Sequence, residues 1–151
     1  MTAAITLHVL STVVWVGGMF FAYVCLRPVA AASLEPPARL RLWAGVFGSF
    51  FPWVWAAVLL LLVTGYWMLF AVFGGFGVVG LHVHLMQAIG ILMMLLFGHV
   101  FFAPYRRLRA AVAKEDWAAG GAALGQIRKL VGVNLILGLI VVAVGSGGRY
   151  F

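Results

Sequence analysis

The stretch LHVHLM, residues 81–86, places two histidines at the beginning of a long apolar run. Ionisable side chains are costly in hydrocarbon, so a histidine within a membrane span usually has a function. Imidazole nitrogens bind copper, zinc and haem iron. The candidate metal ligands are therefore the four histidines of the chain, which are His8, His82, His84 and His99.

The composition identifies the environment of these histidines. Of the 151 residues, 66% are hydrophobic and only 9% are charged, and the mean hydropathy is +1.15. A soluble domain needs a larger polar surface than this. We therefore predict an all-α integral membrane protein whose main partner is the lipid bilayer, with one transmembrane domain over residues 1–151. The net charge of +7 fits basic loops that face anionic lipid, and no nucleic-acid partner is expected.

Apolar runs of about 20 residues, the length that crosses a bilayer, occur four times and predict a four-helix bundle. The predicted spans cover about residues 4–26, 50–73, 81–103 and 130–147, and the basic connections cover residues 27–49 and 104–129. The connection between the second and third spans carries no charge. The positive-inside rule then places both basic connections in the cytoplasm and both termini outside. No Lys or Arg precedes the first span, so we do not expect a cleavable signal peptide.

Both basic connections are expected to be partly helical. The segment SLEPPARLRLW, residues 33–43, offers Ser33 or Glu35 as the N-cap of a helix that leads into the second span. The third span should continue into the cytoplasm and break near residues 114–116. The chain should then return as an amphipathic helix.

The positions of the charged residues exclude several chemistries. All Lys, Arg, Asp and Glu residues fall outside the spans or at their ends, which excludes carboxylate catalysis within the bilayer. The single cysteine, Cys25, excludes an intramolecular disulfide and a Cys-paired zinc site. Chemistry in the bundle must therefore use imidazole, thioether, hydroxyl, aromatic or amide groups, or a cofactor.

His8 and His84 form the expected ligand pair. Each lies about one turn inside the outer end of its span, and the two spans run in the same direction, so the rings are expected at one depth. In an up-down bundle with neighbouring axes about 10 Å apart, the first and third spans face each other across a diagonal of about 14 Å. This gap suits two imidazoles with an iron porphyrin between them.

Helical phase favours His84 over His82 as the inward-facing ligand, because residues two apart on a helix point about 200° apart. His82 is then expected at the membrane interface. Small residues on the inner face of the first span would leave room for a macrocycle, and a hydroxyl or amide would orient an imidazole ring. The cofactor-binding residues expected on these two faces are His8, Ser11, Trp15, Gly18, His84 and Gln87.

His99 lies about 22 Å deeper than His84 and about 60° away in helical phase. It could be a lone ligand, a ligand shared across a dimer, or an interfacial residue. Copper is the alternative metal, with His8, His84 and His82 as an outer site and His99 as an inner one. Thioether sulfurs are also potential copper ligands, but Met19, Met93 and Met94 form no ladder along one helix face.

Two segments carry a family resemblance, LHVLSTVVWVGGMFFAYVCLRP (residues 7–28) and HVHLMQAIGILMMLLFGHVFFAPYRRLRAAV (residues 82–112). Both resemble the CopD-like family of small bacterial membrane proteins. The first is also similar to the four-helix HemJ-type protoporphyrinogen oxidases. The resemblance implies a four-helix bundle in the bacterial cytoplasmic membrane, with copper handling in the first family and haem b with porphyrinogen oxidation in the second. The family histidines correspond to His8, His84 and His99. The chain lacks a basic residue in its third span and has only four spans, which departs from the oxidases and from the longer copper-resistance members respectively.

Three functional hypotheses result. The first is a b-type haem protein for electron transfer near the outer face, a possible oxidoreductase, with a quinol or a periplasmic redox protein as partner. The second is a copper-binding or copper-transport protein. The third is a membrane subunit without a cofactor. Polar and small residues in the fourth span could also mediate a homodimer, and these residues are Gly132, Asn134, Gly138 and Gly145.

Overall fold

The computed structural model of the chain describes residues 1–148. Two residues of the C-terminal segment GSGGRY, Arg149 and Tyr150, lie outside the described residues. The described chain is helical over nearly its whole length. Its elements are α1 (Thr2–Phe20), the π-helical segment η1 (Phe21–Leu26), α2 (Arg27–Ser33), α3 (Pro36–Trp67), the π-helical segment η2 (Met68–Val72), α4 (Leu81–Phe102), α5 (Pro104–Ala113) and α6 (Trp117–Gly147).

These elements form four long helical rods, each long and apolar enough to cross a membrane. The rods cover Thr2–Ser33, Pro36–Val72, Leu81–Ala113 and Trp117–Gly147. This confirms the predicted all-α membrane protein with four candidate spans. Each rod is longer than the predicted span, because the basic segments are largely helical and continue the spans. Pro52, near the beginning of the predicted second span, consequently lies inside α3.

The predicted helix breaks in the two basic segments are confirmed. Glu35 is the N-cap residue of α3, in an extended conformation, and Pro36 occupies the first helical position, where a missing N–H costs nothing. The second break has Glu115 in the left-handed region, with a φ of 55°. Asp116 then caps α6, because its carboxylate accepts a hydrogen bond of 3.0 Å from the backbone N–H of Ala119.

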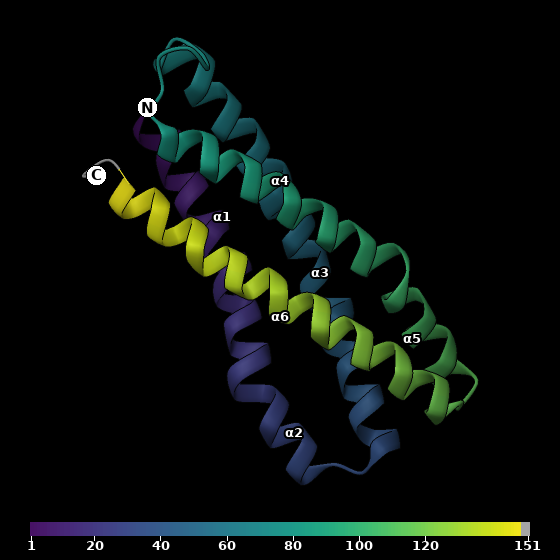
Figure 1. Ribbon diagram of the computed structural model, residues 1–151. Helices are drawn as coiled ribbons and strands as arrows, with labels where there is room; N and C mark the ends of the chain where they lie inside the picture. The colour runs from purple at the N-terminus through teal and green to yellow at the C-terminus, as the bar shows by residue number, and fades with distance from the viewer. Residues whose placement is uncertain (149–151) are drawn as a thin grey trace.

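The rods form two layers, with α1 beside α3 in one layer and α6 beside α4 and α5 in the other (Figure 1). The N-terminus, the connection at residues 73–80 and the end of α6 lie at one end of the bundle, which we call the His8 end. The connections at residues 34–35 and 114–116 lie at the other end, which we call the basic end. Consecutive rods therefore alternate in direction.

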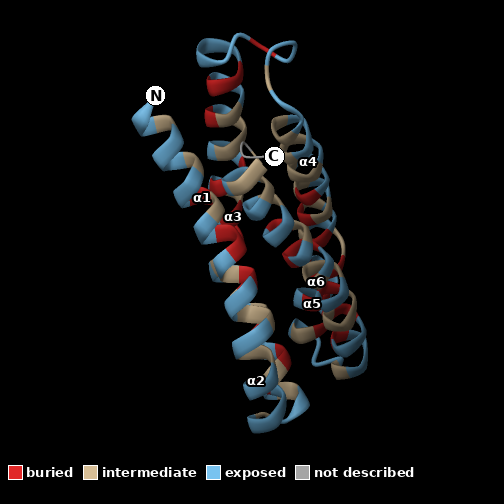
Figure 2. Ribbon diagram, turned by 60° about the vertical axis from the view of Figure 1, so that its left-hand side comes forward, coloured by how far each residue is buried: buried red, intermediate tan, exposed pale blue. Residues whose placement is uncertain are grey.

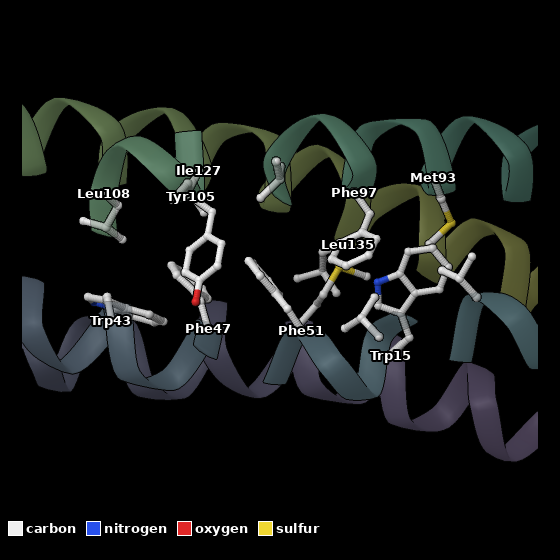
Figure 3. Packing of buried hydrophobic residues seen from close by; sticks show 14 of the residues in the cluster. Trp15, Trp43, Phe47, Phe51, Met93, Phe97, Tyr105, Leu108, Ile127 and Leu135 are labelled. Carbon is white, nitrogen blue, oxygen red and sulfur yellow. The ribbon is translucent and has the colours of Figure 1, made fainter. Parts of the chain in front are cut away.

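Buried residues lie on the faces where the two layers meet, and exposed residues cover the outside (Figure 2). Aromatic side chains fill the middle of the bundle (Figure 3). Phe51 of α3 stacks on Phe47 at 5.1 Å and meets the edge of Phe97 of α4 at 5.4 Å. Trp15 of α1 packs against the same Phe97 at 6.1 Å. These contacts fix α1, α3 and α4 relative to one another. Trp15 also lines the cavity described next.

Candidate metal site

A cavity of about 200 Å³, which we call the His8 cavity, lies between the rods at the His8 end. Most of the surface of its wall is apolar, and the side chains with chemistry are one imidazole, four thioethers, a phenol, a hydroxyl and two groups with N–H donors. These residues are His8, Thr12, Trp15, Tyr66, Met68, Met86, Gln87, Met93 and Met94. Imidazole and thioether ligands together suit copper, and thioethers favour copper(I).

The His8 ring is held in one orientation by α3. Its Nδ1 atom lies 2.8 Å from the hydroxyl oxygen of Thr64. The Thr64 hydroxyl donates its hydrogen to the backbone carbonyl of Leu60, at 2.5 Å, so its oxygen is left to accept from the ring. With the hydroxyl hydrogen in that bond, we assign the proton of a neutral His8 ring to Nδ1, which leaves the lone pair of Nε2 available to a metal. Thr64 itself is buried.

A glycine of α3 makes room for this ring. A Cβ atom at Gly65 would lie 3.2 Å from Cε1 of His8, closer than side chains normally approach. Neither Thr64 nor Gly65 was among the predicted site residues. The signal that could have found Thr64 is its position, because it is a hydroxyl residue near the same end of the second span as His8 is in the first.

Two predicted orienting residues act differently from the expectation. Ser11 is buried, but its hydroxyl donates to the carbonyl of Leu7, at 2.7 Å, within α1. Gln87 lines the His8 cavity, yet its amide donates to the hydroxyl of Tyr66, at 2.8 Å. The group that orients the imidazole is therefore the threonine of α3.

The two other predicted residues of α1 differ from each other. Trp15 is 3% exposed and lines the His8 cavity. Gly18 lies deeper, on a second cavity of about 250 Å³ in the middle of the bundle. The space beside Gly18 is filled by the ring of Phe50, so it does not leave room for a macrocycle.

The prediction that His84 faces the interior is wrong. His84 is exposed and stacks on Phe76, with ring centres 6.1 Å apart. Leu95, three turns further along α4 on the same side as His84, is 67% exposed. The inner face of α4 instead carries Met93 and Phe97, both buried. Large apolar side chains of α4 form its contacts with the other layer, and Gln87 and Gly90 face the His8 cavity.

The remaining histidines also lie apart from the His8 cavity. His82, expected at the interface, is half-buried and packs close to Gly148 at the end of α6. His99 is exposed in the last turn of α4, near the middle of the rod that α4 and α5 form. Among residues 1–148, no group of three or more His, Cys, Asp or Glu side chains is placed to hold a metal ion.

These positions bear on the two predicted ligand sets. The structure does not bring His8 and His84 to one cavity, so the described residues do not fit a haem held between these two rings. It does bring four methionines to the cavity of His8. Met68 comes from η2, and Met86, Met93 and Met94 come from α4.

Comparison with known families agrees with the membrane fold. The family model described as copper resistance protein D, CopD, matches residues 44–147. The chain belongs to the CopD family. The matched region of this CopD-family protein includes Thr64 and all four methionines of the cavity, whereas His8 precedes it. No curated protein and no solved structure matches the chain.

Proposed function

We propose that this CopD-family membrane protein binds copper(I) as its cargo in the His8 cavity. The observation that carries the proposal is the meeting of one oriented imidazole with four thioethers on a single cavity wall. His8 would bind through Nε2, and the thioethers of the η2 and α4 methionines would supply the remaining ligands. The family description, copper resistance, supports the same metal.

The charge of the ligand set favours copper(I) over other metals. The wall of the His8 cavity has no carboxylate and no thiol among the described residues. Calcium and magnesium require several oxygen ligands, and zinc sites are built from thiolate, imidazole and carboxylate. A monovalent, soft cation is the one that neutral thioethers and imidazole bind best, and its single charge costs least in an apolar surrounding.

The orientation we propose places the His8 end in the periplasm of a bacterium and the basic end in the cytoplasm. Its support is the distribution of charge, since the nine Lys and Arg residues of the described chain all lie in the two connections of the basic end or in the helical segments beside them. Copper would then enter the cavity from the periplasmic side. This proposal involves no chemical reaction at the site.

The test is an anaerobic titration of the purified protein with copper(I) against a chromogenic copper(I) chelator. We expect one tightly bound ion, and a loss of affinity of at least about tenfold in His8→Ala and in the double variant Met86→Leu/Met94→Leu. Met19→Leu is the matched control, because Met19 is a buried thioether that does not line the His8 cavity. Unchanged affinity in both cavity variants would overturn the proposal.

The same preparation separates the other two hypotheses. Haem b bands in a reduced-minus-oxidised difference spectrum, if they are lost in His8→Ala, would support the hypothesis of a haem protein. The redox partner to test for would then be a quinol or a periplasmic protein. A protein with neither haem bands nor bound copper would support the membrane subunit without a cofactor.

A further inference from the structure

A third cavity lies at the opposite end of the bundle from the His8 cavity. It has a volume of about 310 Å³ and is bounded by η1, α2, the beginning of α3 and the first half of α6. These elements are the lower segments in Figure 1. We call it the basic cavity, because three arginines line it, namely Arg27 of α2, Arg39 of α3 and Arg128 of α6.

The three arginines have no acidic counterpart. The one ion pair within residues 1–148 joins Arg41 to Glu115 at 2.9 Å, on the exposed surface. The wall of the basic cavity contains neither Asp nor Glu. Arg27 lies over the ring of Tyr23, with its guanidinium carbon 4.5 Å from the ring centre, which holds it at the wall. Three guanidinium groups around one cavity create a positive potential that favours an anion.

The rest of the wall is apolar. Leu40, Trp43 and Phe47 are all at most 6% exposed and belong to the hydrophobic core. Two residues of α6, Gly121 and Gly125, leave open space beside the helix, since a Cβ atom at either would meet nothing within 4 Å. A free phosphate would pair with the arginines and leave this apolar space unfilled. A phospholipid satisfies both parts, because it carries a phosphate and an acyl chain.

We propose that the basic cavity binds an anionic phospholipid. Its phosphate pairs with Arg27, Arg39 and Arg128, and an acyl chain lies against Trp43 and Phe47. The arginines lie at the basic end, the level at which Lys and Arg side chains of membrane proteins meet lipid headgroups. The lipid joins α2 to α3 and α6. The proposal does not depend on copper binding.

The first arm of the test is native mass spectrometry of the detergent-purified protein with equal amounts of phosphatidylglycerol and phosphatidylcholine. We expect preferential retention of phosphatidylglycerol. The triple variant Arg27→Gln/Arg39→Gln/Arg128→Gln should lower its affinity at least about tenfold. The control Arg106→Gln/Lys114→Gln/Lys129→Gln removes the same charge from the basic end outside the cavity and should lower it by less than about threefold.

The second arm distinguishes a lipid from a free phosphate. Gly121→Leu/Gly125→Leu keeps the arginines and fills the apolar space, and we expect it to lose phosphatidylglycerol. Inorganic phosphate at millimolar concentration should not displace the lipid from the wild-type protein.

Three results would overturn the proposal. The first is equal retention of phosphatidylglycerol and phosphatidylcholine. The second is an equal loss of affinity for phosphatidylglycerol in the arginine triple variant and in the charge control. The third is that phosphate fully displaces phosphatidylglycerol while Gly121→Leu/Gly125→Leu still binds the lipid normally. The comparison of lipids and the phosphate competition use the wild-type chain, so the test stands even if a variant does not fold.

Discussion

The Nδ1 atom of His8 lies 2.8 Å from the hydroxyl oxygen of Thr64, and this contact connects α1 to α3 at the wall of the His8 cavity. The Thr64 hydroxyl donates to the carbonyl of Leu60 within its own helix. With the hydroxyl hydrogen in that bond, the oxygen accepts from the imidazole, and we assign the proton of a neutral His8 to Nδ1, which leaves Nε2 unprotonated. The contact thus determines the tautomer as well as the orientation of the ring.

Replacing Thr64 should weaken copper(I) binding without removing a ligand. Thr64→Val keeps the shape of the side chain but removes the acceptor, and we expect a loss of about 10- to 100-fold in affinity, the range found for groups that orient a metal ligand. Thr64→Ser keeps the hydroxyl and should bind copper like the wild type. The chelator competition titration measures both. Equal affinity in the valine variant and the wild type would mean that Thr64 does not control the ligand.

A glycine of α6 tests the contribution of one thioether. A Cβ atom at Gly145 would lie 2.8 Å from the sulfur of Met86, so Gly145→Ala should displace this flexible side chain. We expect weaker copper(I) binding with unchanged thermal stability. Gly17→Ala is the control, because a Cβ atom there meets nothing within 4 Å. If the two alanine variants bind copper equally, the sulfur of Met86 is not a ligand.

Gly18 should matter for packing and not for a cofactor. A Cβ atom at this position would lie 2.3 Å from the ring of Phe50, which packs against the core. Gly18→Ala should therefore destabilise the protein by about 1–3 kcal/mol, the usual cost of overpacking. Thermal stability in detergent is measured as the temperature at which the monodisperse peak disappears in size-exclusion chromatography. This temperature should be lower for Gly18→Ala and unchanged for the control Gly17→Ala. A neutral Gly18→Ala would show that Phe50 can move aside.

The sequence predicted the architecture well, for a physical reason. Membrane spans and basic connections are set by composition, and composition is visible without a structure. The break at Glu115 and the capping of α6 by Asp116 were likewise visible as polar residues between two helical patterns. Helix length was less predictable, because the basic segments form helices as readily as the apolar runs do.

The orientation of α4 could not be predicted in the same way. This helix is apolar on all sides, so hydrophobicity does not distinguish its lipid-facing side from its inner side. Helical phase alone could show that His82 and His84 face different sides, and His84 was assigned inward, whereas the burial of Met93 and Phe97 turns it outward. The pairing of His8 with Thr64 depends on how two helices far apart in sequence are rotated, which only the packing of the bundle determines.

The buried amide of Asn134 tests whether α6 needs a polar group in its middle. Its Nδ2 atom donates to the carbonyl of Met93 at 3.4 Å, and its Oδ1 atom has no partner among the described residues. Such contacts contribute on average about 0.6 kcal/mol in membranes, so Asn134→Leu should change stability by less than about 1 kcal/mol. The thermal chromatography assay applies here as well. A larger loss would indicate that the amide has a structural role beyond this one hydrogen bond.

The last prediction concerns the side of the membrane on which the His8 cavity opens. With the native cysteine replaced by Cys25→Ser, the variants Gly77→Cys and Lys114→Cys place a single thiol in the exposed connections at the two ends of the bundle. Because the connection around Gly77 is uncharged and the one around Lys114 is basic, we expect the former in the periplasm and the latter in the cytoplasm. A membrane-impermeant maleimide should label Gly77→Cys in cells with an intact cytoplasmic membrane, and Lys114→Cys only after the membrane is opened. The reverse pattern would place the His8 cavity on the cytoplasmic side, and copper would then reach it from inside the cell.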